Sequence, residues 1–237
     1  MLTKVLIVNG SPRIEKSNTT FVITPFMEGM KKAGASVEMI YTKKLKILPC
    51  IGCFKCWGET IGECFIQDDM QELYPKLKEV DILIIATPVY SPLPGEIQNL
   101  LNRLVPLIEP LLEFRQGRTR AKCHDDVNIS KMLAVVVGGW WEIENLDLVV
   151  KIVEEVSETY TIEFSGAILR PHAYFLRDES ETSKLILKKL EDVGFKLIKE
   201  GILDKTDLAF VSQPLVKKEE YIERGNRNYL KRKSEQN

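Results

Sequence analysis

The stretch KVLIVNGSPRIEKSNTT, residues 4–20, predicts the first strand of the fold, the loop after it and the start of the first helix. Its apolar run is short and continuous, which is typical of a strand buried on both faces of a parallel sheet. Further strands are predicted at residues 36–42, 81–88, 131–139 and 162–169. Helical periodicity separates them, at residues 18–34, 68–80, 96–112, 143–160 and 180–201. This alternation predicts an α/β fold whose parallel sheet is covered by helices on both faces.

Length and composition favour one main domain. The 237 residues, with 44% hydrophobic content, can bury one substantial core without requiring a second. We expect residues 1–204 to form this domain, with a cysteine-rich loop at 47–67 and an insertion at 113–130. Residues 205–237 would form a C-terminal extension, and the charged stretch 224–237 is expected to be a frayed or surface-draped tail.

Charge and hydropathy exclude some classes of partner. Lys and Arg number 33 against 34 Asp and Glu, which gives a net charge of -1. This balance argues against nucleic acid or an anionic membrane as the main partner. The N-terminus reads as a strand rather than a signal peptide, and no run approaches the roughly 18 apolar residues that span a bilayer. We therefore predict a cytoplasmic protein, in whose reducing environment clustered cysteines serve metal or redox chemistry more often than disulfides.

The loop after the first strand can bind an anion. It lacks the G-x-G-x-x-G and G-K-[ST] patterns of nucleotide-binding loops. Instead, hydroxyl, amide and guanidinium groups surround a helix N-terminus, where backbone N–H groups and the helix dipole favour a phosphate. The alternative is that Ser17 and Asn18 only cap the helix.

Two further loops would lie at the same edge of the sheet. TPVYSPLPG, residues 87–95, follows the third strand, and Tyr90 with its neighbours could line one side of a flat aromatic ligand. GGWW, residues 138–141, follows the fourth strand. Large apolar side chains there could either cover such a ligand or pack against the insertion.

Together, G-S-P-R with S-N-T and T-P-V-Y with a downstream N-R resemble the flavodoxin-like NAD(P)H-dependent FMN reductases over most of residues 1–170. The resemblance implies a doubly wound, five-stranded parallel sheet in the order 2-1-3-4-5. It also implies that the FMN phosphate is bound by Ser11, Arg13, Ser17, Asn18 and Thr19. The flavin ring would contact Pro88, Val89, Tyr90, Ser91 and Leu93, with Gly138, Gly139 and Trp140 as a third wall.

The stretch PCIGCFKCWGETIGEC, residues 49–64, places Cys50, Cys53, Cys56 and Cys64 in a C-x2-C-x2-C-x7-C pattern. Four thiolates are the usual ligands of a four-iron cluster. Zinc also takes four thiolates, although its structural sites usually pair two C-x2-C knuckles across a longer spacer. The pattern therefore favours iron–sulfur and leaves zinc as the alternative.

Within an FMN-reductase-like chain, this motif resembles the iron-sulfur flavoproteins of anaerobic microbes. That resemblance implies one [4Fe-4S] cluster and one FMN per subunit, a homodimer or homotetramer, and electron transfer from a ferredoxin-like donor, with NAD(P)H as a further candidate. The x7 spacing is at the long side for that family, so Cys64 is the ligand most in need of structural support. All three loops belong at one sheet edge, which predicts a cluster beside the flavin.

Two other functions stay open on the sequence. One is an NAD(P)H-dependent FMN or quinone reductase without a functional cluster. The other is a flavodoxin-like binding module with a zinc knuckle. No Ser/His/Asp arrangement or carboxylate pair suggests a catalytic side chain, and His124, His172 and Cys123 are expected to pack rather than react.

Overall fold

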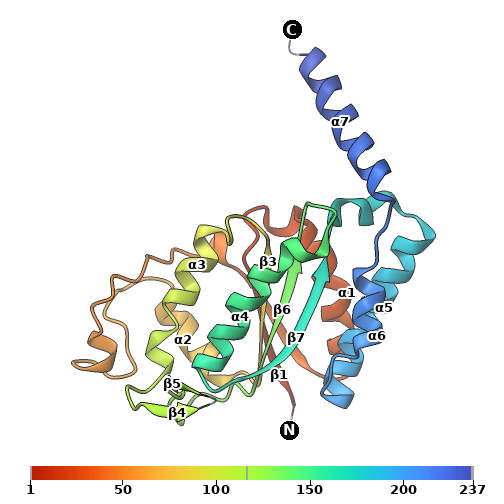
Figure 1. Ribbon diagram of the computed structural model, residues 1–237. Helices are drawn as coiled ribbons and strands as arrows, with labels where there is room; N and C mark the ends of the chain where they lie inside the picture. The colour runs from red at the N-terminus through yellow and green to blue at the C-terminus, as the bar shows by residue number, and fades with distance from the viewer. Residues whose placement is uncertain (1, 116, 236–237) are drawn as a thin grey trace.

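A parallel sheet forms the centre of the protein, in a computed structural model that describes residues 2–115 and 117–235 (Figure 1). The strands are β1 (Lys4–Asn9), β2 (Ser36–Tyr41), β3 (Ile82–Pro88), β6 (Lys131–Val137) and β7 (Glu163–Arg170). Their order is β2-β1-β3-β6-β7, and every pair is parallel. Counted without a separate hairpin, this is the predicted flavodoxin-like order 2-1-3-4-5, which is confirmed.

Seven α-helices occur in the described residues, and all but the last lie in two layers on the sheet (Figure 1). They are α1 (Asn18–Lys32), α2 (Met70–Glu79), α3 (Gly95–Asn102), α4 (Asp147–Thr159), α5 (Glu181–Glu200), α6 (Lys205–Ser212) and α7 (Lys218–Ser234). Short 3₁₀ helices occur at Ile14–Lys16, Thr42–Lys44, Lys55–Trp57, Val105–Leu107, Ile143–Leu146 and Ala173–Asp178. No helix in the described ranges is both long and apolar enough to cross a membrane.

The apolar runs of the strands bury both faces of the sheet. Leu6 and Leu83 face α2, α3 and α4, whereas Ile7 and Ile84 face α1, α5 and α6. All four side chains are fully buried. Because successive strand residues point to opposite faces, a continuous apolar run requires a cover on each side.

Helices α1 and α5 approach each other closely through a pair of glycines. A Cβ built on Gly29 would lie 1.9 Å from the Glu191 carbonyl oxygen, and one on Gly194 would lie 2.0 Å from that of Phe26. Real atoms do not approach this closely, so any side chain at either position would force the helices apart. Gly225, in α7, has open space around it.

The helix predicted at 96–112 is shorter than expected. It ends at Asn102, and a single 3₁₀ turn at Val105–Leu107 follows. Pro106 lacks an N–H and disfavours helical backbone in the residue before it. The apolar periodicity continues past Asn102 because Leu104 and Leu107 are buried, although no longer as one helix.

The predicted insertion at 113–130 contains a short hairpin. Strands β4 (Glu113–Arg115) and β5 (Arg118–Arg120) pair antiparallel, and Gln116 lies outside the described residues. Arg118 and Arg120 both form ion pairs with Glu155 of α4. These ion pairs hold the hairpin against α4, and Ala121 and Ile129 of the insertion are buried in the core.

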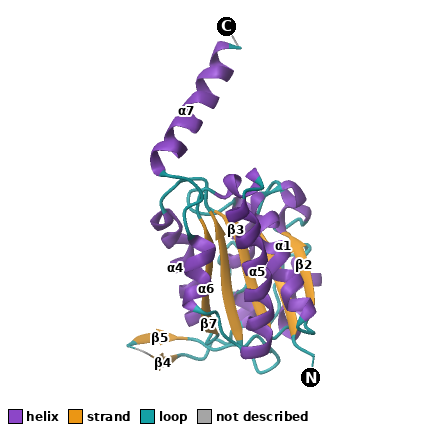
Figure 2. Cartoon of the chain, turned by 90° about the vertical axis from the view of Figure 1, so that its right-hand side faces the viewer, coloured by secondary structure: helices purple, strands orange, loops and turns teal. Residues whose placement is uncertain are grey.

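The prediction of a frayed or surface-draped C-terminal tail is wrong. Helix α6 packs against the core through Val211, whereas α7 rises from the carboxyl end of the sheet, with the hairpin at the opposite end (Figure 2). Acidic residues occupy the first turn of α7 and basic residues the last, which suits the helix dipole. Glu223 also pairs with Arg227 one turn on. Residues 236–237 lie outside the described part.

We predict that Gly194→Ala lowers the free energy of unfolding by about 3 kcal/mol, because its methyl group has to displace the α1 backbone. Gly225→Ala is the matched control, since it also replaces a helical glycine but meets no atom, and we expect a change below about 1 kcal/mol. Urea unfolding of both variants checks this. Equal effects at the two positions would contradict the close packing of α1 on α5.

Candidate functional site

A hydrogen-bonded network holds the loop after β1. The Ser17 hydroxyl accepts from the Thr20 backbone N–H at 3.0 Å and so caps α1. The Thr20 hydroxyl donates to the Ile14 carbonyl at 2.8 Å and accepts from the Asn9 amide at 3.0 Å. Ser17 therefore has the capping role that the sequence left open, and the network fixes where the first N–H groups of α1 point.

The backbone of this loop is strained. Ile14 has a φ of 43°, which a β-branched residue rarely adopts. Gly10, just before the loop, lies so close to α3 that a Cβ would meet the Ile97 Cβ at 2.8 Å. Strain of this kind persists where the surroundings impose it, and it is common at binding sites.

Positive charge gathers at the start of α1. Arg13 is exposed, and its side chain has no partner within the described residues. Arg177, after β7, donates to the Asn18 side-chain oxygen at 2.9 Å and to the Ser17 carbonyl at 3.0 Å. The sequence analysis missed Arg177, although its place after a parallel strand could have suggested the same sheet edge. Two guanidinium groups and a helix N-terminus together favour an anion.

The loops after β3 and β6 lie next to each other. The Val89 N–H donates to the Val137 carbonyl at 2.9 Å, which joins the end of β3 to the end of β6. Tyr90 and Trp140 are 54% and 66% exposed, so both rings are free to contact a ligand. Leu93 is buried in the core and therefore serves packing rather than an open surface.

The other predicted residues of these loops divide in the same way. Pro88 is half-buried, Ser91 and Gly139 are exposed, and Thr19, in α1, is buried together with Ser11. Gly138 is buried, and a Cβ on it would lie 2.8 Å from Leu146 Cδ1. This glycine is therefore required by packing.

His172 supports the loop after β6 from behind. It is fully buried, and its backbone N–H donates to the Trp140 carbonyl at 2.8 Å. Its imidazole Nε2 accepts from the Leu215 backbone N–H at 3.0 Å. Burial and the nearby Arg170 lower the pKa of His172 to about 4, so the imidazole is neutral at pH 7. The histidine packs, as expected.

A buried ion pair closes the cysteine-rich loop. Arg103, 1% exposed, donates from Nη1 and Nη2 to the two Asp68 carboxylate oxygens at 2.7 and 3.1 Å. Arg103 Nη1 also donates to the Leu48 carbonyl at 2.9 Å, and the Leu48 N–H donates to Asp68 at 2.8 Å. Leu48 and Asp68 stand at the two ends of the loop, so one guanidinium holds both.

The charges of this pair are stabilised against burial. Burial alone would raise the pKa of the Asp68 carboxyl, but hydrogen bonds from Arg103 and from backbone N–H groups outweigh it and lower that pKa. Burial likewise opposes the charged guanidinium, and the bonds to Asp68 overcome it, so the pKa of Arg103 is raised. Both groups are therefore ionised at neutral pH.

The long excursion before the last cysteine folds back on itself. The Gly62 N–H donates to the Cys56 carbonyl at 3.0 Å, with Gly62 at a φ of 78°. The Gln71 amide then donates to the carbonyls of Cys64 and Ile66, both at 2.8 Å. These contacts return Cys64 to the other three cysteines, and Gln71 is a further residue that the sequence analysis missed.

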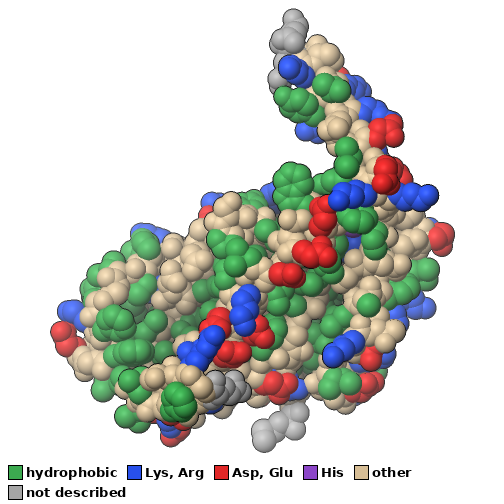
Figure 3. Space-filling model, in the orientation of Figure 1, with side chains coloured by type: hydrophobic (Ala, Val, Ile, Leu, Met, Phe, Trp, Pro, Cys, Tyr) green, Lys and Arg blue, Asp and Glu red, His purple; other side chains and the backbone are tan. Residues whose placement is uncertain are grey.

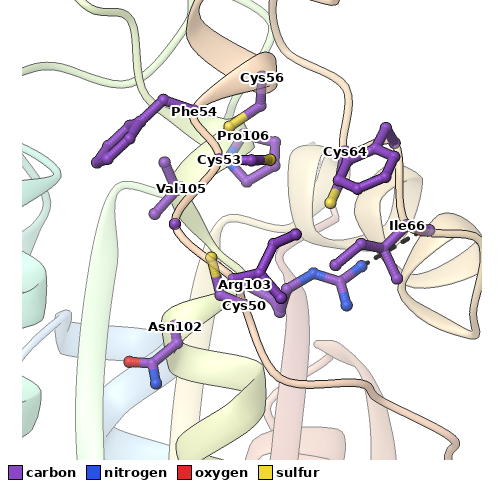
Figure 4. A pocket seen from close by; sticks show the side chains of 13 residues that line it. Cys50, Cys53, Phe54, Cys56, Cys64, Ile66, Asn102, Arg103, Val105 and Pro106 are labelled. Carbon is purple, nitrogen blue, oxygen red and sulfur yellow. Dashed lines mark hydrogen bonds between the residues drawn. The ribbon is translucent and has the colours of Figure 1, made fainter.

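Cys50, Cys53, Cys56 and Cys64 line one cavity of about 70 Å³ (Figure 4). The other lining side chains are mainly apolar and come from the loop and from the turn after α3: Ile51, Phe54, Phe65, Ile66, Asn102, Arg103, Val105 and Pro106. Burial, followed by the three neighbouring thiols, raises the pKa of Cys56. The four cysteines predicted as ligands are thus brought together.

The cavity is too open for one tetrahedral ion. In the described residues, no three Cys, His, Asp or Glu side chains lie close enough to hold a single metal ion. Zinc, with Zn–S bonds near 2.3 Å, would need sulfurs about 3.8 Å apart. A volume of about 70 Å³ holds several bodies the size of a water molecule. The arrangement fits a larger, thiolate-bound group better than one zinc ion.

The outer face of the loop is apolar. Ile51, Phe54 and Ile61 are 66%, 58% and 62% exposed. Figure 3 shows hydrophobic side chains gathered on the left of the view, where Figure 1 draws this loop.

Cys123, the fifth cysteine, does not line the cavity. Its thiol donates to the Tyr160 carbonyl, and burial raises the pKa of this thiol to about 12.

The sequence predicts a cluster beside the flavin. In the structure, the cysteine cavity is separated from the loop at 88–94 by the length of α3. It is lined by Asn102 and Arg103 at the C-terminal end of α3, whereas the loop at 88–94 leads into the N-terminal end. An eight-residue helix separates the two, a length of about 12 Å. The reason is that the chain after β2 runs along α3: the Asn99 amide donates to the Ile47 carbonyl at 3.1 Å, and Arg103 donates to the Leu48 carbonyl at 2.9 Å.

Comparison with known proteins agrees with this architecture. The profile of the NADPH-dependent FMN reductase family matches residues 3–139, more than half of the chain. An iron-sulfur flavoprotein of Archaeoglobus fulgidus is 37% identical over 101 residues, which are 42% of this chain and 48% of the relative. One from Methanocaldococcus jannaschii is 36% identical over 105 residues, 44% of this chain and 53% of the relative. The chain thus spans about half the length of these relatives.

Solved structures share the fold. An azoreductase from Bacillus anthracis superimposes with a TM-score of 0.58 at 14% identity, covering 82% of this chain and 100% of that one. An NAD(P)H:quinone oxidoreductase from Methanothermobacter marburgensis gives 0.53 at 16% identity, covering 83% and 98%. The sheet order, the loops at its carboxyl edge and the family match lead to one conclusion: the chain belongs to the NADPH-dependent FMN reductase family, and its matching half is similar to iron-sulfur flavoproteins.

Proposed function

We propose that this protein is an FMN-dependent oxidoreductase that transfers electrons and whose four clustered cysteines bind a [4Fe-4S] cluster. The observation that carries the proposal is that Cys50, Cys53, Cys56 and Cys64 line one apolar cavity in a chain of a flavin reductase family. Four thiolates in apolar surroundings form the ligand set of such clusters. The iron-sulfur flavoproteins that share this half of the chain support the same assignment.

The residues at the carboxyl edge of the sheet are the proposed FMN site. Arg13, Ser17 and the first N–H groups of α1 would bind the phosphate, with Arg177 nearby as a second positive charge. Tyr90 and Trp140 would contact the ring, since both are exposed on adjacent loops. Ser11 and Leu93 would shape the loops from within, because both are buried.

Bound there, FMN accepts one or two electrons and a four-iron cluster passes one at a time, which suits exchange between carriers of the two kinds. The chain's own contribution is to orient both groups and to exclude water with the apolar cavity wall. NAD(P)H is a proposed donor because of the family. A ferredoxin-like donor and a homo-oligomeric assembly stay predictions of the sequence.

We predict that protein purified without oxygen contains about four irons and one FMN per chain. Cys64→Ser should lose most of its iron, because the contacts of Cys64 and Gln71 place this thiol in the cavity. Cys123→Ser is the matched control and should keep its iron, since Cys123 lies outside the cavity. Iron, sulfide and flavin analysis of wild type, Cys64→Ser and Cys123→Ser measures the iron and FMN bound per chain.

Zinc in place of iron, with FMN still bound, would contradict the cluster and favour the reductase without one. Equal iron loss in Cys64→Ser and Cys123→Ser would contradict the assignment of the fourth ligand. Protein that binds neither FMN nor iron would reject the proposal as a whole.

We predict that Arg13→Ala weakens FMN binding by about tenfold or more, because a charge-assisted hydrogen bond contributes roughly 1.5–3 kcal/mol. Lys16→Ala, which removes an exposed charge from the same loop, is the control and should change it far less. Riboflavin lacks the phosphate, so its affinity should be the same in wild type and Arg13→Ala. Quenching of flavin fluorescence measures the five dissociation constants, and a parallel loss of riboflavin affinity would contradict a phosphate contact.

A further inference from the structure

Arg103 carries five N–H donors, and four of them have acceptors in the part of the chain that the structure describes. Nη1 donates to Leu48 and Asp68, and Nη2 donates to Asp68 and, at 3.5 Å, to the Ile66 carbonyl. The fifth donor, on Nε, is buried and has no hydrogen-bond partner among the described residues. A buried charged donor without an acceptor is costly, so it is rare in folded proteins.

The position of this donor points to its acceptor. Arg103 lines the cavity that the four cysteines share (Figure 4). The end-on pairing with Asp68 uses both Nη groups and holds the guanidinium plane still, so Nε cannot turn to another partner. The other polar groups of the cavity wall are the four thiols, the Asn102 amide and the backbone, and the thiols of Cys50 and Cys64 are drawn on either side of Arg103 (Figure 4).

We propose that Arg103 is a positioning residue whose Nε–H donates a hydrogen bond to the sulfur-bound group in the cysteine cavity and raises its reduction potential. This rests on the proposed function, which supplies the acceptor. Donors near cluster sulfurs stabilise the reduced form, because that form carries one more negative charge. The same side chain that closes the loop would therefore also set the potential of the site.

Two variants separate this role from loop closure. Arg103→Lys keeps a positive charge that can pair with Asp68 but lacks the Nε–H donor. Asp68→Asn keeps the donor and removes the charge that offsets the guanidinium. We expect the midpoint potential to fall by about 59 mV in Arg103→Lys, which is a tenfold change in a one-electron equilibrium. In Asp68→Asn it should rise.

Lys55→Gln is the control, because Lys55 also lies on the loop but its charge is exposed and paired with Glu59. Its potential should equal that of wild type. Midpoint potentials come from titrations of the holoprotein followed by electron paramagnetic resonance. Opposite shifts in the two variants support the proposal, whereas unchanged potentials in iron-loaded variants overturn it.

A measurement on wild-type protein tests the same hydrogen bond if a variant does not fold. Wild-type holoprotein labelled with ¹⁵N-arginine should show a ¹⁵N hyperfine coupling in the electron nuclear double resonance spectrum of its reduced state. Absence of that coupling overturns the role of Arg103 while the cluster stands. Wild type without iron would refute the proposed function itself, and this assignment with it.

Discussion

The bidentate ion pair between Arg103 and Asp68 is the contact on which the cysteine-rich loop depends. It joins the two ends of a segment that has only one short 3₁₀ turn of its own. Buried ion pairs add little net stability, because desolvation offsets most of their attraction, but removing one partner leaves a costly charge. Such a pair therefore specifies an arrangement more than it strengthens the fold. Here it decides that four thiols share one cavity.

The parallel sheet places the cysteine-rich loop and the loops after β1, β3 and β6 on one half of the molecule. Each connection leaves the carboxyl end of a strand, so the segments after β1, β2, β3 and β6 start from a common edge. The strand order β2-β1-β3-β6 places the loop after β1 between the loops after β2 and β3. Helix α3 runs from the loop at 88–94 to the cysteine cavity, so this short helix sets the distance between the proposed FMN site and the proposed cluster.

The strands could be predicted from local pattern, and the sheet order from the resemblance to the FMN reductases. The cysteine spacing predicts a ligand set, which stays a prediction. Continuous apolar runs identify the buried strands, and thiol spacing is visible without a structure. The end of the helix at Asn102 was missed, since buried leucines continue the apolar pattern through a turn that Pro106 interrupts. Helix α7 was missed as well, because it is charged and buries no side chain. Glu223 pairs with Arg227 inside the helix, and Arg224 pairs with Asp178 after β7.

Long-range partners account for the rest. Arg103 and Asp68 are 35 positions apart, and Arg177 meets the loop after β1 from more than 150 positions away. No spacing rule links such residues, so only the fold brings them together. We propose that the four cysteines surround one polynuclear iron centre. X-ray absorption at the iron edge of anaerobic protein tests it most directly: a sulfur-only first shell with iron neighbours behind it is predicted, and iron without an iron neighbour would contradict it.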